Sequence, residues 1–235
     1  MIKCIREIFS SIQGEGIYVG KRQIFIRFTK CNLDCYYCDT PHKRDVKFTV
    51  VQGKKKILND INDVIREIEN LKTRDVFSIS LTGGEPLLYT EIIEELAEKI
   101  DIPLYLETNS TLPDRARKIE KFITYAALDI KTNYPNFYEK TLETIKIFKN
   151  KKSIIKVVVA DDLNEEKIEK ISLDIRKIND IPLILQPITE KITGKFSKIE
   201  REKYLKKILK FSEIASNYLS DVRIIPQVHK FLKIK

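Results

Sequence analysis

The sequence predicts an α/β fold, an open and partial (βα) barrel of about six parallel strands. Short apolar runs recur along the chain, and stretches with the 3.6-residue apolar period of a helix separate most of them. The runs are apolar at consecutive positions, which is typical of strands in a parallel sheet covered by helices. Six or seven such units are too few for a closed eight-fold barrel.

The elements follow in order from local composition. Each predicted strand is rich in Ile, Val, Leu and aromatic residues and is bounded by polar residues. The predicted strands are 24–28, 76–81, 103–107, 124–130, 154–159 and 182–186. The predicted helices are 60–72, capped by Asn59 or Asp60, a helix capped by Thr90 that reaches Ile100, 137–149, 164–178 and 198–216. A last apolar run, 222–225, precedes the tail.

Composition limits the classes of protein that fit. The chain has 235 residues, and we expect one domain over 1–235 with an N-terminal extension (1–22) and a C-terminal tail (217–235) that closes the active site. No apolar stretch is long enough for a membrane helix, and charged residues interrupt the first residues, so we expect a cytoplasmic protein. The net charge of +9 comes from lysines scattered over solvated faces, so we expect no direct nucleic-acid partner.

Three of the four cysteines lie within eight residues. Cys31, Cys35 and Cys38 form a C-x₃-C-x₂-C group directly after the first predicted strand. Three thiolates on one loop can hold three corners of a [4Fe–4S] cluster and leave the fourth iron open to a small molecule. A cluster with an open iron is typical of S-adenosylmethionine (SAM) radical chemistry.

Zinc is the main alternative for these cysteines. A structural zinc site takes four ligands, and Asp39 or His42 would complete the set. However, such sites usually pair two C-x₂-C knuckles, and the sequence has no second knuckle. Cys4 stands apart and fits a small buried residue.

The other candidate residues mostly follow strands. They form Thr82-Gly83-Gly84-Glu85-Pro86, Glu107-Thr108-Asn109, Asp129-Ile130-Lys131 and Gln186-Pro187-Ile188-Thr189. The carboxyl ends of parallel strands meet on one face of a barrel, so we expect these segments to converge there. Taken singly, each segment also fits an ordinary turn after a strand.

Two features lie outside those segments. Gln13-Gly14-Glu15-Gly16 places an amide and a carboxylate between glycines, which fits either a Gly-rich turn or recognition of the hydrogen-bonding edge of a heterocycle. Arg27 interrupts an apolar strand and needs an anionic partner, either an internal carboxylate or a ligand.

Together these motifs resemble the 7-carboxy-7-deazaguanine synthase family of radical SAM enzymes. The three-cysteine and Gly-Gly-Glu motifs are general to radical SAM enzymes. The features that point to this family are Gln13-Gly14-Glu15-Gly16, Cys38-Asp39-Thr40 and the tail Gln227-Val228-His229-Lys230. The resemblance runs from near residue 5 to the last residue.

The resemblance implies conversion of 6-carboxy-5,6,7,8-tetrahydropterin to 7-carboxy-7-deazaguanine with loss of ammonia, in deazapurine (queuosine or archaeosine) biosynthesis. It implies that the cluster is held by Cys31, Cys35 and Cys38, and that Thr40 binds Mg²⁺. The implied SAM-binding residues are Tyr37, Cys38, Asp39, Gly84, Glu85, Glu107, Asn109, Asp129, Ile130, Lys131, Gln186, Pro187, Ile188 and Thr189. The implied substrate-binding residues are Ile12, Gln13, Gly14, Glu15, Arg27, Thr82 and Lys235.

The resemblance also implies partners and leaves an alternative. It implies an external electron donor of the flavodoxin or ferredoxin type and a homodimer. Asp129-Ile130-Lys131 departs from the family's Ser-Pro-Lys and suggests, as an alternative, a radical SAM enzyme that activates glycyl-radical enzymes. A zinc-binding or nucleic-acid-binding protein without catalytic activity is the other alternative, favoured only by the basic charge.

Overall fold

The computed structural model describes residues 1–38, 45–194 and 196–234. The chain divides into two compact units. The first consists of Met1–Gln13, Gly20–Thr108 and Leu112–Ala126, and the second of Gly14–Val19, Asn109–Thr111 and Ala127–Lys235. Each unit is described by itself below.

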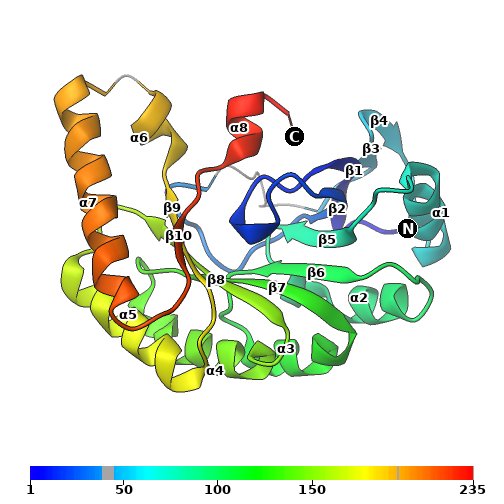
Figure 1. The fold of residues 1–235 in the computed structure, drawn as a ribbon. Coiled ribbons are helices and arrows are strands. Elements are labelled where there is room, and N and C mark those ends of the chain that lie inside the picture. The colour runs from blue at the N-terminus through cyan, green and yellow to red at the C-terminus, as the bar shows by residue number, and fades with distance from the viewer. Residues whose placement is uncertain (39–44, 195, 235) are drawn as a thin grey trace. The chain divides into compact units, whose positions relative to one another are not determined.

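The first unit is built on a mixed sheet (Figure 1). Its strand order is β7-β6-β5-β2-β1-β3-β4. The strands are β1 (Ile5–Ile12), β2 (Arg22–Phe28), β3 (Thr49–Val51), β4 (Lys54–Lys56), β5 (Ser78–Gly83), β6 (Leu104–Thr108) and the first half of β7 (Ile123–Ile130). β2, β5 and β6 are parallel neighbours, whereas β1 runs antiparallel to β2.

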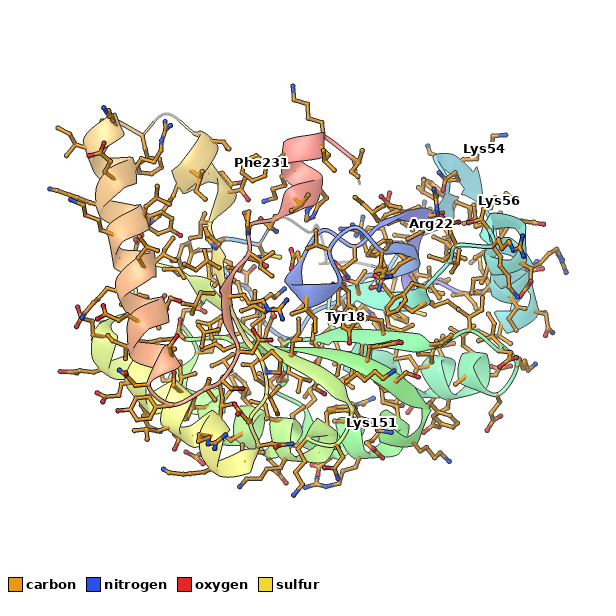
Figure 2. The ribbon with its side chains drawn as sticks, in the orientation of Figure 1. Tyr18, Arg22, Lys54, Lys56, Lys151 and Phe231 are labelled. Carbon is orange, nitrogen blue, oxygen red and sulfur yellow. The ribbon has the colours of Figure 1, made fainter. Side chains whose placement is uncertain are left out.

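The described residues of the first unit also form three helices and two 3₁₀ turns. They are α1 (Ile61–Leu71), η2 (Pro86–Tyr89), α2 (Thr90–Ala97), α3 (Pro113–Ile119) and η3 (Glu120–Phe122). α1 begins where Asp60 accepts hydrogen bonds from the backbone of Asn62 and Asp63, and it buries Ile61, Val64 and Ile68. Edge strand β4 consists of three lysines, of which Lys54 extends into solvent (Figure 2); charged side chains on an edge strand discourage pairing with another chain.

The second unit repeats the strand-and-helix pattern. Its strand order is β10-β9-β8-β7, with the second half of β7. The elements are η1 (Gly16–Tyr18), η4 (Pro135–Phe137), α4 (Tyr138–Phe148), β8 (Lys152–Val159), α5 (Glu165–Ile178), β9 (Leu183–Pro187), α6 (Thr189–Thr193), α7 (Lys198–Ser216), β10 (Val222–Ile224) and α8 (Val228–Leu232). α5 packs against α7 (Figure 1). The parallel strands β8 and β9 are almost wholly buried.

All six predicted strands are present as β2, β5, β6, β7, β8 and β9, and the five predicted helices as α1, α2, α4, α5 and α7. Two details differ. Thr90 is the first residue of α2 and not its cap, because Tyr89 precedes the helix with extended φ and makes no side-chain cap. β1 lies within the stretch expected as an extension, which therefore contributes a strand to the sheet.

Candidate active site

The cysteine loop leaves β2 in the first unit. Cys31 and Cys35 are partly exposed, Cys38 is exposed, and all four cysteines of the chain are thiols rather than disulfides. The Cys38 amide donates to the Cys35 carbonyl over 3.0 Å, which closes a turn between the second and third cysteine. Three soft donors on one accessible loop suit iron–sulfur ligation.

A zinc ion and an iron–sulfur cluster need different arrangements of the three cysteines. In the part of the chain that the structure describes, no three His, Cys, Asp or Glu side chains converge as ligands of one metal ion. A single zinc ion needs its ligands around one point, whereas each thiolate of a cubane binds a different iron. Asp39, Thr40 and His42 lie outside the described residues.

The turn after β5 is held against the start of this loop. A Cβ atom at Gly84 would lie 2.0 Å from the Lys30 carbonyl oxygen, so only glycine permits this approach. The Glu85 amide donates to the same carbonyl over 2.7 Å. The Glu85 carboxylate is fully buried and accepts from the Leu87 amide and the Thr108 hydroxyl. The predicted SAM-binding residues Gly84 and Glu85 therefore also fix where the cysteine loop begins.

Glu107 connects two predicted substrate-binding residues in the first unit. Its Oε1 accepts from Gln13 Nε2 over 2.8 Å, and its Oε2 accepts from the Thr82 hydroxyl over 2.7 Å. Ser80 adds a third donor at 3.0 Å. The carboxylate that the resemblance assigns to SAM thus orients side chains that it assigns to substrate.

Arg27 has an internal anionic partner. Its Nε lies 3.3 Å from Glu7 Oε2, and its guanidinium stacks 5.5 Å from the centre of the Phe9 ring. The internal ion pair, one of the two alternatives for this arginine, is therefore present. A guanidinium carries five N–H donors, which is more than one carboxylate uses.

Glu15 is the centre of the polar contacts in the second unit. Lys156 Nζ donates to its Oε2 over 2.5 Å and Gln227 Nε2 donates to its Oε1 over 2.8 Å. The Gly14 carbonyl accepts from the Val228 amide, and a Cβ atom at Gly14 would overlap the His229 ring. Glu15, predicted to bind substrate, therefore ties the segment after β1 to the tail.

Lys156 also reaches a second carboxylate. Its Nζ lies 3.2 Å from Asp129 Oδ1, and Lys131 Nζ lies 2.6 Å from Asp129 Oδ2. All four side chains are largely buried, between 11% and 19% exposed. The predicted SAM-binding residues Asp129 and Lys131 thus belong to a chain of alternating charges that ends at Glu15.

These buried charges keep the Glu15 carboxyl ionised. Burial alone would raise the pKa of the Glu15 carboxyl, but the charge and hydrogen bond of Lys156, the amide of Gln227 and nearby His229 lower that pKa from 4.5 to about 2. Glu15 is therefore ionised, and its two oxygens bind Lys156 and Gln227.

We expect the second unit to lose stability in acid through Glu15. A folded-state pKa of about 2 against 4.5 unfolded gives stabilisation that is complete above about pH 4.5 and disappears as the pH falls towards 2. The size is about 3 kcal/mol. Urea unfolding over this pH range should show a shallower loss in Glu15→Gln than in the wild type, with the exposed Glu202→Gln as control. Parallel slopes in wild type and Glu15→Gln would contradict this.

The side-chain oxygen of Gln186, at the end of β9, is a buried hydrogen-bond acceptor. The residue is 5% exposed, and its Oε1 meets no hydrogen-bond donor among the described residues. Buried amide oxygens are normally satisfied. The amino group and ribose hydroxyls of SAM are donors, so this position fits SAM.

The remaining predicted residues have the following places. Ile12 ends β1 and pairs with Arg22, Ile130 is buried at the end of β7, and Pro187 ends β9. Tyr37 meets Tyr36 edge to face at 5.0 Å. Asn109 Oδ1 accepts from the amide and hydroxyl of Thr111, the Ile188 amide donates to the Tyr204 hydroxyl, and the Thr189 hydroxyl donates to Gln227. Asp39, Thr40 and Lys235 lie outside the described residues.

Sequence reasoning missed Lys156 and Gln23, and it named Gln227 in the tail motif without expecting its contact with Glu15. Lys156 is the lone charge in the apolar run 154–159, the same signal that singled out Arg27. Gln23 is fully buried and accepts from Gln13 over 2.9 Å. Its position at the polar start of an apolar strand gave no signal of that kind.

Comparison with known proteins places this site in a family. Residues 25–175 match the model of the radical SAM superfamily. The chain is 35% identical to the 7-carboxy-7-deazaguanine synthase of Archaeoglobus fulgidus, over 97% of each chain. It is 38% identical to that of Methanocaldococcus jannaschii, over 97% of this chain and 98% of the relative.

A solved structure agrees on the fold. QueE from Escherichia coli superposes with a TM-score of 0.60 over 97% of this chain and 94% of that chain, at 22% identity. The predicted open α/β fold of radical SAM type is confirmed, and the relatives favour the deazaguanine synthases over an activator of glycyl-radical enzymes. No described helix is long and apolar enough to cross a bilayer. The chain belongs to the 7-carboxy-7-deazaguanine synthase family of the radical SAM superfamily.

Proposed function

We propose that the chain converts 6-carboxy-5,6,7,8-tetrahydropterin to 7-carboxy-7-deazaguanine and ammonia. The observation that carries this proposal is the identity of 35–38% over nearly the whole chain to relatives named for that product. Superfamily membership implies a [4Fe–4S] cluster and SAM. When bound, these supply a carbon-centred radical that removes a hydrogen atom from the substrate.

The chain's own residues bind and orient. Cys31, Cys35 and Cys38 would hold the cluster, which fits their soft donors and accessible loop. Gln186 would accept a hydrogen bond from SAM at its buried Oε1. Gln13 and Thr82, held by Glu107, would contact the substrate, and Arg27 would bind its carboxylate. Fixing the substrate in one orientation leaves one C–H bond open to attack.

Several further assignments belong to this proposal. We expect one domain whose tail, 217–235, closes the active site with Lys235 on the substrate. We also expect an external flavodoxin-type or ferredoxin-type donor and a homodimer. Turnover tests the core of the proposal: anaerobically reconstituted protein with SAM, reductant and the carboxytetrahydropterin should give a product lighter than the substrate by one ammonia. Cleavage of SAM without that product would overturn it.

Magnesium dependence tests the assignment of Thr40. A hydroxyl binds Mg²⁺ when waters and substrate oxygens fill the other positions. We expect Thr40→Ala to need at least about tenfold more magnesium for half-maximal activity, while Thr40→Ser, which keeps the hydroxyl, responds like the wild type. Titration of magnesium against initial rate measures this. Identical magnesium curves for wild type and Thr40→Ala would contradict the assignment.

A further inference from the structure

A chain of buried hydrogen bonds crosses the sheet of the first unit. Ser78 on β5 accepts from Gln23 Nε2 over 2.9 Å, and Gln23 on β2 accepts at Oε1 from Gln13 Nε2 over 2.9 Å. Gln13 Nε2 also donates to Glu107 Oε1 on β6 over 2.8 Å. Gln23 and Ser78 are fully buried and Gln13 is 3% exposed. Gln23 and Ser78 are direct partners in the strand register, so backbone pairing fixes their contact.

The direction of this chain is set by Glu107. An ionised carboxylate only accepts hydrogen bonds, so the Gln13 atom that faces Glu107 must be the amide nitrogen. The same nitrogen faces Gln23, which must therefore present its oxygen. The Gln23 nitrogen is then left for Ser78, whose hydroxyl can accept. One charge thus determines how both amides are turned.

This direction decides what Gln13 can offer a ligand. An amide nitrogen has two hydrogens, and here one is directed to Gln23 and the other to Glu107. Any hydrogen bond from the Gln13 side chain to a ligand must then use Oε1 as an acceptor. A ligand that meets this side chain is required to bring a donor.

We propose that Gln23 and Ser78 are positioning residues that make Gln13 an obligate acceptor and so select a substrate whose exocyclic group at C2 of the pyrimidine ring is a donor. The inference rests on the proposed function, under which Gln13 contacts a pterin. The exocyclic amino group of a pterin is such a donor. A lumazine carries an oxygen in place of that amino group. This oxygen and Gln13 Oε1 are both acceptors, so they cannot form a hydrogen bond.

Two air-stable probes test the selection without turnover. Fluorescence titration of the SAM-loaded, reconstituted protein with oxidised 6-carboxypterin and with 6-carboxylumazine gives both dissociation constants. We expect the wild type to prefer the pterin by about tenfold. In Gln23→Met, which is matched in volume but has no polar group, one Gln13 N–H loses its acceptor, so Gln13 is no longer limited to accepting hydrogen bonds. The preference should then fall to about twofold, and KM for the carboxytetrahydropterin should rise about tenfold with kcat within about twofold.

Two more variants separate positioning from folding. Ser78→Ala removes the acceptor that holds the Gln23 amide against Gln13. It should reduce the preference by an intermediate amount, and it tests the inference even if Gln23→Met does not fold. Thr49→Val removes another fully buried hydroxyl of the first unit, one that donates to the Ile5 carbonyl, and should leave the preference unchanged.

The outcomes distinguish this inference from the proposed function. If the wild type forms the deazaguanine but binds both probes equally, the inference is overturned. It is also overturned if Gln23→Met and Ser78→Ala keep the wild-type preference. A wild type that forms no deazaguanine overturns the proposed function, and the inference with it.

Discussion

Cys35→Ala is expected to remove the iron–sulfur cluster and with it all product formation. Cys35 is the middle ligand of the three, and a cubane held by two thiolates loses its attachment to the loop. Protein reconstituted without oxygen should lose the brown absorbance near about 400 nm that a thiolate-ligated cluster gives. Circular dichroism should stay unchanged, because Cys35 is not part of the buried core.

Cys4→Ala is the matched control for this variant. Burial raises the pKa of the Cys4 thiol to about 11, so it remains protonated and is a poor metal ligand. Cys4→Ala should therefore keep its colour and activity. A coloured and active Cys35→Ala protein, or a colourless Cys4→Ala protein, would show that the ligands are assigned wrongly.

Lys156→Met is expected to lower the free energy of unfolding by about 3–5 kcal/mol at neutral pH. Lys156 forms ion pairs with both Glu15 and Asp129. Its removal takes away the Glu15 pair, whereas Asp129 keeps its pair with Lys131. Such a loss is a large part of the total stability of a domain. Urea unfolding monitored by circular dichroism measures it.

Two comparisons show that charge and not packing causes the loss. The double variant Glu15→Gln with Lys156→Met should recover about half of the lost stability, because one stranded carboxylate is gone. Lys152→Met, at the exposed start of the same strand, should change stability by less than about 0.5 kcal/mol. If Lys156→Met lowers the free energy of unfolding equally in the wild type and in Glu15→Gln, the loss is due to packing alone.

The repeating part of the fold was predictable because its signal is local. Strands such as 154–159 and helices such as 60–72 carry continuous or periodic apolar patterns, and both lie where expected. β1 was missed because its burial follows no alternation and a bulge separates Ile5 from Glu7. β3, β4 and α3 are too short to show a period.

The contacts of the candidate site residues could not be predicted from the sequence. The motifs and the family resemblance singled out Gln13, Glu15 and Glu107, but their partners depend on register and on distant chain segments. Glu15 meets Lys156 across 141 residues, and Gln13 meets Glu107 across 94. The sequence alone does not show that Glu15 holds the tail, because its two glycine neighbours suggest an open turn instead.

The metal content of protein purified without oxygen tests the central claim most directly. That claim is a [4Fe–4S] cluster on Cys31, Cys35 and Cys38 with one iron left for SAM. Iron and acid-labile sulfide should be present in equal amounts with no stoichiometric zinc, and SAM should change the electron paramagnetic resonance spectrum of the reduced cluster. Colourless protein that contains zinc and no sulfide would contradict the claim.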